Sequence, residues 1–513
     1  MNFHKTLTIA VAMTATASAM ANTLDPNNPS GTVVDRFADI EVMRYVVPGF
    51  DDLTLSQKKL IYFLTEAALH GRDILWDQNG KYNLPIRQLL ESVYTNYTGD
   101  RSSEEFRNFE LYLKQVEFGN GVYHHYSTDK FTPRFSQKWF DAQVSALEKA
   151  DRLPVNKSQL PVLAKVIFDP SFMPKRVNQA AGQDLITTSA VNMYENVTQP
   201  EVEAYYAALK DTTDLTPVSY GLNSRLVKDA DGTIREQVYK VGSYYSDAIE
   251  KIVADLEKAL PFAENQQQKA VIEELVKFYR TGSLKTFDDY SILWAEDTDS
   301  QVDFINGFIE SYGDPLGMTG SWESIVNFKN QAASHRTEVV SSNAQWFEDH
   351  SPVDPRFRKP HVKGVSAKVI NAAILAGDAY PSTPIGINLP NSNWIRAAHG
   401  SKSVTIENIT QAYDDASHGN GFNEEFVIDE PTRELFDKYL FITDNLHTDL
   451  HECLGHGSGQ LLPSRLTVPH WKRPAPTCSR STISPTRNCL NSACSTPPTP
   501  TRPNTTSTCS TAS

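Results

Sequence analysis

The residues most able to do chemistry in this 513-residue chain form the run HECLGH at positions 451–456. Imidazole nitrogens are common zinc ligands, and a glutamate beside bound zinc takes a proton from the water that the metal holds. Two histidines that flank a glutamate therefore indicate a zinc hydrolase. The alternative is an ordinary helix end that carries two surface histidines.

The spacing of the histidines differs from the usual His-Glu-x-x-His pattern by one residue. A four-residue offset leaves two helical side chains about 40° apart, whereas the five-residue offset from His451 to His456 rotates them by about 140°. Both can face one ion if the helix carries an extra residue, as in a π-type turn, and Gly455 makes such a turn cheap. We therefore predict metal ligands at His451 and His456 and a general base at Glu452. His447 is either a further ligand or a polar helix residue.

Composition narrows the class of protein. The chain has 48 Lys and Arg against 62 Asp and Glu, a net charge of -14, so nothing suggests a nucleic-acid partner. Its length suffices for two or more lobes. No stretch after the N-terminus is apolar enough to span a bilayer. The sequence does not indicate the oligomeric state.

The N-terminus has the features of a secretory signal. Lys5 precedes an apolar and small-residue run at 7–17, and Ala19-Met20-Ala21 fits the small-x-small rule for cleavage. We expect residues 1–21 to be a signal peptide and the protein to be exported, to the periplasm or outside the cell. A membrane anchor is the weaker alternative, because the apolar run is short and contains threonines.

Apolar periodicity predicts a helix-dominated α+β fold. Helices are expected over residues 56–70, 244–260 and 267–279, where apolar side chains recur on one face. The runs 162–168 and 369–375 look like strands but alternate poorly, so a helix is equally possible for each.

Two loops contain polar residues that suit peptide binding. Glu310 and Tyr312 precede a Gly-Asp-Pro turn, where a carboxylate can receive an ammonium group. Asn388 and Asn391 flank Pro390, which favours an extended backbone and lets both amides face a peptide. On its own, the first loop is better interpreted as a capped helix end and the second as a turn.

Together these segments resemble dipeptidyl peptidase III, a family of zinc exopeptidases, over nearly all of residues 22–460. The resemblance rests on HECLGH followed by GSGQ at 457–460, on the NLPN loop at 388–391, and on the runs 343–350 and 393–396. It implies release of dipeptides from the free N-termini of short peptides. The implied roles are zinc ligation by His451 and His456, proton transfer by Glu452, and substrate binding by Glu310, Tyr312, Asn388 and Asn391.

The resemblance also implies two lobes around a wide cleft, a helical zinc lobe and a mixed lobe with a small β-barrel. We expect the mixed, substrate-binding lobe to comprise residues 22–330 and 369–416. The zinc lobe would comprise residues 331–368 and 417–463 and would be incomplete in this chain.

The C-terminal part departs from the family pattern. The family takes its third zinc ligand from a later glutamate, yet no Asp or Glu follows Glu452. Residues 464–513 are a low-complexity tail that we expect to be disordered. We interpret the tail as a truncation or frameshift, because an assumed GC-rich codon set read out of phase from Cys478 gives Leu-Glu-Glu. The activity of the chain as written is therefore in doubt.

Two alternatives to a dipeptidyl peptidase remain open. One is a non-catalytic remnant that binds peptides, since the substrate-binding residues are retained. The other is a different zinc aminopeptidase or endopeptidase. The products released from a free and an N-acetylated peptide distinguish the three.

Overall fold

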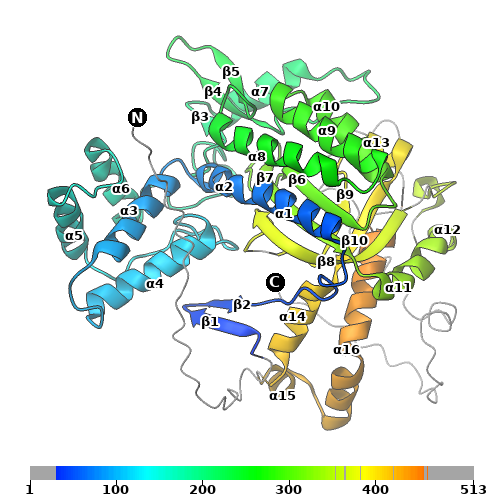
Figure 1. Ribbon diagram of the computed structural model, residues 1–513. Coiled ribbons are helices and arrows are strands. Elements are labelled where there is room, and N and C mark those ends of the chain that lie inside the picture. Colours follow the sequence, from blue (N-terminus) through cyan, green and yellow to red (C-terminus); the bar gives the residue numbers. More distant parts are fainter. Residues whose placement is uncertain are drawn as a thin grey trace.

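The computed structural model describes residues 31–459 except 353, 363–364, 382, 420 and 456–458. The predicted signal peptide at 1–21, the expected ligand His456 and the tail at 464–513 therefore lie outside the described residues. The described chain is an α+β structure in which helices predominate (Figure 1), as the sequence predicts.

The strands of the described residues form one five-stranded sheet, one three-stranded sheet and one hairpin. Their bounds are β1 Val33–Phe37, β2 Ile40–Met43, β3 Tyr194–Glu195, β4 Ser224–Lys228, β5 Ile234–Val238, β6 Val302–Glu310, β7 Ser321–Lys329, β8 Val365–Gly377, β9 Gly386–Leu389 and β10 Ser401–Ile406.

The helices surround these sheets. Their bounds are α1 Leu55–His70, α2 Arg72–Asn79, α3 Asn83–Asn96, α4 Glu104–Gly119, α5 Gln137–Lys149, α6 Leu160–Phe168, α7 Gln199–Leu209, α8 Ser246–Ala259, α9 Gln266–Thr281, α10 Leu284–Glu296, α11 Gln331–Ser342, α12 Ala344–Asp349, α13 Asn393–His399, α14 Glu407–Ser417, α15 Phe422–Phe426 and α16 Glu430–Leu450. Short 3₁₀ turns are η1 Lys157–Gln159, η2 Leu260–Phe262 and η3 Pro355–Phe357, and η4 His451–Gly455 is a π turn.

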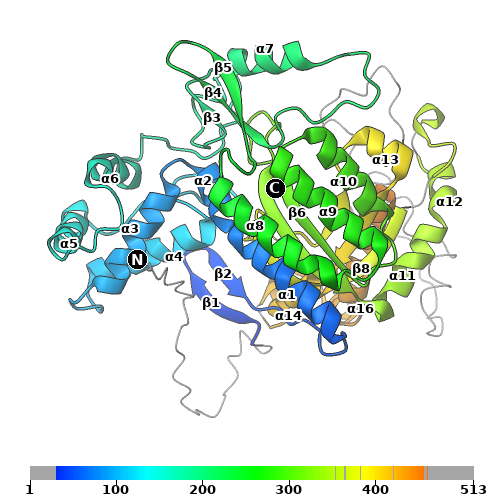
Figure 2. The same cartoon turned by 45° about the horizontal axis from the view of Figure 1, so that its top comes forward.

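The three helices predicted from periodicity are confirmed as α1, α8 and α9. The sequence sets their ends: Thr54 caps α1 in a capping box with Gln57, and Gly282 ends α9 with a left-handed φ of 70°. Their apolar faces enter the main core together with β6 and β7. In Figure 2, α1, α8 and α9 lie across one face of the large sheet.

The two ambiguous runs resolve differently. Residues 162–168 belong to helix α6, so a strand is wrong there; Leu163, Val166 and Ile167 are buried at helical spacing. Residues 369–375 lie in strand β8, so a helix is wrong there. β8 lies between β7 and β10, and the successive residues 369–372 are all buried. Both faces of the strand are therefore covered, which explains why it does not alternate between apolar and polar residues.

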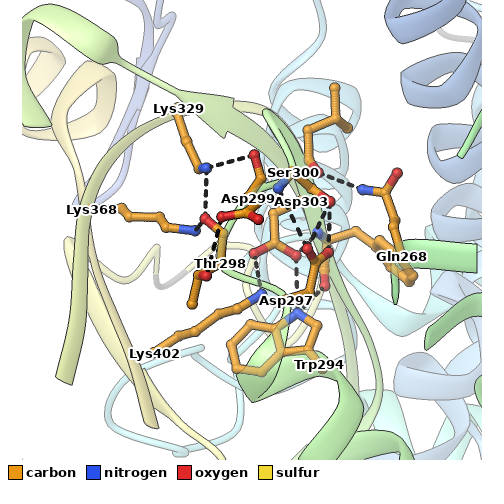
Figure 3. A network of polar contacts seen from close by, with 12 residues as sticks. Gln268, Trp294, Asp297, Thr298, Asp299, Ser300, Asp303, Lys329, Lys368 and Lys402 are labelled. Carbon is orange, nitrogen blue, oxygen red and sulfur yellow. Dashed lines mark hydrogen bonds and ion pairs between the residues drawn. The ribbon is translucent and has the colours of Figure 1, made fainter. Parts of the chain in front are cut away.

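The five-stranded sheet, with the order β6-β7-β8-β10-β9, is strongly curled. Two strands separate β6 from β10, yet Lys402 Nζ of β10 lies 2.8 Å from Asp303 Oδ2 of β6. Trp294 Nε1 of α10 donates to Asp303 Oδ1 at 3.0 Å, and the Lys402 ammonium lies 4.3 Å from the Trp294 ring centroid (Figure 3). The expected barrel is thus a curled sheet with β6 and β9 at its edges among the described strands, and Trp294 links α10 to β6 and β10.

Smaller cores flank the main one. Helices α3 to α6 share a cluster of their own, and Val340 and Phe347 of α11 and α12 pack with Leu450 and Leu454 near the histidine motif. The boundaries of the two lobes remain a prediction. No helix in the described part of the chain is long and apolar enough to cross a bilayer.

Candidate active site

The histidine motif adopts the backbone geometry that its spacing predicts. Helix α16 ends at Leu450 and continues directly into the π turn η4, which covers His451 to Gly455. In such a turn the hydrogen bonds join residues five apart, so residues at this offset lie above one another. The predicted extra residue is confirmed. The position of His456, which follows the turn, lies outside the described residues.

Glu452 is held against the curled sheet. The residue is 7% exposed, and its backbone carbonyl accepts hydrogen bonds from Ser403 Oγ at 2.7 Å and Asn388 Nδ2 at 3.5 Å. Burial raises the pKa of its carboxyl to about 8, and the Arg396 guanidinium opposes this shift. A carboxyl whose pKa lies near neutrality is suited to general acid–base catalysis.

Gly386 of β9 leaves the space that the Glu452 side chain occupies. A Cβ at this position would lie 2.7 Å from both Cγ and Oε1 of Glu452. We predict that Gly386→Ala lowers kcat about 10-fold to 100-fold by displacing the Glu452 side chain from Cγ outwards. The melting temperature should fall only modestly, because none of the three nearest atoms belongs to the backbone. Parallel kinetics and thermal melts test this. An unchanged kcat would mean that the Glu452 carboxylate need not occupy this space.

A buried ion pair fixes the helix that leads into the π turn. Asp449 is 0% exposed; its Oδ2 lies 2.6 Å from Arg336 Nε of α11, and its Oδ1 accepts from Thr405 Oγ1 at 2.6 Å. Arg336 also lies 3.4 Å from Glu407. The end of α16 is thereby attached to both α11 and β10, two residues before His451.

The curl of the sheet brings two of the predicted substrate residues together. Glu310 ends β6 and Asn391 follows β9, at opposite edges of the sheet, yet Asn391 Nδ2 donates to Glu310 Oε1 at 3.1 Å. Burial raises the pKa of Glu310, the hydrogen bond from Asn391 lowers it, and the nearby Asp378 raises it further. A partly buried carboxyl in this environment is stabilised in its charged form by a cation.

Asn388 links this pair to the histidine motif. Its side chain is 9% exposed, and Nδ2 donates to Ser401 Oγ at 3.2 Å as well as to Ser403 and to the carbonyl of Glu452. Arg396 Nη2 donates to its Oδ1. The sequence predicts amides that face a peptide, whereas here the Asn388 amide is engaged by protein groups.

Tyr312 and His447 are the more exposed of the predicted residues. Tyr312 is 73% exposed. Partial desolvation, and then the charges of Glu310 and Glu452, raise the pKa of its hydroxyl, so the ring lies within electrostatic reach of both carboxyls. His447 is exposed on the last turn of α16, where its carbonyl accepts the backbone N–H of His451.

Sequence reasoning missed Arg396, which lies near both acidic residues of the site. Arg396 is on α13, which begins two residues after Asn391. The sequence shows an arginine eight residues after Asn388, but it does not show that the Arg396 side chain reaches Asn388. That contact depends on how α13 packs against β9.

The donor chemistry of the motif suits zinc, which binds imidazole readily. The π turn and the partly buried imidazole of His451 are consistent with this. Desolvation lowers the pKa of His451, and the lower pKa favours the neutral form of the imidazole, which is the form that binds a metal. Among the described residues, no group of three His, Cys, Asp or Glu side chains lies close enough together to hold a metal ion. His456 is not among them.

Comparison with known proteins identifies the family of this chain. Residues 198–467, more than half of the chain, match the sequence model of Peptidase family M49. The chain belongs to peptidase family M49. This M49 chain is 25% identical over 466 residues to dipeptidyl peptidase 3 of Dictyostelium discoideum, covering 84% of this chain and 63% of the relative. It is 24% identical over 456 residues to human dipeptidyl peptidase 3, covering 80% and 60%.

Solved structures support the fold of this M49 chain. It superposes on dipeptidyl-peptidase III from Corallococcus sp. strain EGB with a TM-score of 0.59 at 18% identity, covering 82% of this chain and 65% of that one. DPP III from Caldithrix abyssi gives a TM-score of 0.57 at 19% identity, with 80% and 65% covered. The α+β fold is therefore confirmed. The chain spans less than two thirds of the length of each of these proteins.

Proposed function

We propose that the protein is a zinc-dependent peptidase that releases dipeptides from the free N-terminus of short peptides. The observation that carries the proposal is the connection between the two halves of the site. Asn391 donates a hydrogen bond to Glu310 where the two edges of the curled sheet approach each other. Asn388, three residues before Asn391, donates to the backbone carbonyl of Glu452. An anchor for an amine and a general base therefore sit on one rigid support.

His451 and His456 would hold the zinc, which when bound supplies polarisation of the scissile carbonyl and a more acidic water. Glu452 takes the proton from the attacking water and passes it to the leaving amine. Ser403 and Asn388 fix the backbone of Glu452, and Gly386 leaves room for its carboxylate.

Anchoring of the N-terminus accounts for release of dipeptides rather than single residues. The partly buried Glu310 carboxylate pairs with the ammonium group of the peptide, and Asn391 orients that carboxylate. A fixed distance between this anchor and Glu452 selects the second peptide bond. Blocking the amine leaves a desolvated carboxylate without a cation, which is costly.

The test compares a free hexapeptide with its N-acetylated form. We expect dipeptide release from the free peptide and a kcat/KM at least about 100-fold lower for the acetylated one, because several kcal/mol of ion pairing is lost. Mass spectrometry of the products checks this. Binding without cleavage would support the non-catalytic alternative, and single residues or internal cuts would support a different peptidase.

A further inference from the structure

Three lysines from three strands of the curled sheet meet at one short segment outside the proposed site. Lys329 ends β7, Lys368 lies in β8 and Lys402 lies in β10. The segment is residues 297–301, which joins α10 to β6. In Figure 3 the side chains of the three lysines point towards this segment and the start of β6. The sheet thus gathers three cations around one short connection.

Two of these ammonium groups share one neutral acceptor. Lys368 Nζ donates to the backbone carbonyl of Thr298 at 2.6 Å. Lys329 Nζ donates to the same oxygen at 2.9 Å and to the carbonyl of Asp299 at 3.1 Å. Within the part of the chain that the structure describes, neither Lys329 nor Lys368 forms an ion pair with a carboxylate. Two like charges therefore lie side by side, which is unfavourable for both.

Lys402 adds a third positive charge next to this pair. Its side chain is 0% exposed, and its Nζ lies 2.8 Å from Asp303 Oδ2 and 4.3 Å from the Trp294 ring centroid (Figure 3). The charges that act most on Lys368 are those of Lys402, Asp303 and Lys329. One carboxylate thus faces three amino groups, and the cluster favours loss of a proton from one of them.

Lys368 is the lysine that gives up its proton most readily. Desolvation, together with the charges of Lys402 and Lys329 and against that of Asp303, lowers its pKa to about 7. A lysine that is neutral near this pH has a free lone pair, and lysines that are desolvated or next to another cation act as nucleophiles. The contacts of Lys368 and Lys329 with Thr298 lie at the surface, so a small molecule from solution reaches the amine.

We propose that Lys368 reacts with carbon dioxide and carries it as a carbamate. The amine nitrogen attacks the carbon of carbon dioxide, and a C–N bond forms while one C–O π bond breaks to leave a carboxylate. The nitrogen loses one proton to water. No electron is transferred, and no further reactant is needed. The proposal does not depend on the proposed function, because neither zinc nor a peptide takes part.

The surroundings of Lys368 favour this adduct over others. A carbamate is an anion, so it accepts from the Lys329 ammonium and is attracted by that of Lys402. Its nitrogen keeps one N–H for the carbonyl of Thr298. An ordinary acyl group would leave a neutral amide, which removes the charge of Lys368 but gives the other two lysines no anion.

The test uses the full-length protein in buffer with isotopically labelled bicarbonate, which supplies dissolved carbon dioxide. Triethyloxonium converts a carbamate into a stable ester, and mass spectrometry of peptides locates the ester. The reference within the same sample is Lys277 of α9, which is exposed and paired with Glu274 at 2.8 Å. We expect at least about 10-fold more label at Lys368 than at Lys277, because a far larger fraction of Lys368 is in the amine form. The carbamate resonance in the carbon NMR spectrum should be absent in Lys368→Arg, which keeps the charge but forms no stable carbamate.

Lys329→Gln tests the role of the neighbouring cation. It removes the charge that lowers the pKa of Lys368 and the donor to the carbamate, so the label at Lys368 should fall about 5-fold or more. Lys285→Gln is the matched control, because Lys285 is exposed and paired with Asp289 on α10, and it should leave the label unchanged.

Two results would overturn the proposal. One is the absence of label at Lys368, or equal label at Lys368 and Lys277, in the unsubstituted protein. The other is unchanged label at Lys368 in a folded Lys329→Gln variant. The first comparison is made within the unsubstituted protein, so poor folding of a variant does not affect it.

Discussion

Replacing Glu452 by glutamine is expected to lower kcat for the proposed dipeptide release roughly 10³-fold, within the range for loss of a general acid–base group. Glutamine keeps the size of the side chain and its fit against Gly386, so the expected loss comes from chemistry rather than from packing. Since this residue is a proton carrier in the proposal and not a metal ligand, the zinc content should stay the same. Steady-state kinetics and metal analysis of the same preparation measure both quantities.

Two variants make the result specific. Glu434→Gln removes an exposed glutamate of α16 and should change neither rate nor zinc content. His451→Ala should lose zinc, measured directly by metal analysis. If Glu452→Gln retained more than about a tenth of the rate, Glu452 would not be the proton carrier and another residue would have to take that role.

The parts of the site that depend on local geometry could be predicted from sequence. A histidine spacing of five requires an extra residue in the turn, and a glycine is placed to permit it, so the π turn of η4 followed from two residue types and one distance along the chain. Helices α1, α8 and α9 could be predicted for the same reason, because the periodicity of their apolar residues shows which face of each helix is buried.

The parts that depend on the curl of the sheet could not be predicted in this way. The contact between Glu310 and Asn391 joins residues 81 apart, at the two edges of one sheet. Nothing in the sequence of either strand states how far the sheet bends. The same holds for Lys402 and Asp303, which are 99 residues apart and meet only because β6 and β10 curve towards each other.

The hydrogen bonds of Asn388 could not be predicted for a related reason, and its role in substrate binding stays a prediction. Pro390, two residues after Asn388, correctly indicated extended backbone, and Asn388 does lie in β9. Which way its amide faces is set by Ser401 and Ser403 on the neighbouring strand and by Arg396 on α13. We therefore expect Asn388 to position Glu452, and Asn391 to be the asparagine nearer to the substrate.

Replacing Arg336 by methionine is expected to lower the free energy of unfolding by about 3–5 kcal/mol, because it leaves the other member of a buried ion pair, Asp449, without its cation. Among the described residues, the carboxylate of Asp449, which is 0% exposed, would keep the Thr405 hydroxyl as its one hydrogen-bond partner. Urea denaturation measures the loss. Arg433→Met is the control, because Arg433 pairs with the 72%-exposed side chain of Glu430 on the same helix and such pairs contribute about 0–1 kcal/mol.

The same substitution connects stability to chemistry. Asp449 lies two residues before His451, so release of the ion pair frees the helix end that carries the π turn. Hydrogen exchange of the amides at 445–455 should therefore rise in Arg336→Met and stay unchanged in Arg433→Met, and zinc affinity should fall with it. A loss of zinc affinity without faster exchange would mean that Arg336 acts on the metal through charge rather than by holding the helix. Faster exchange with unchanged affinity would show that the turn forms its site without this anchor.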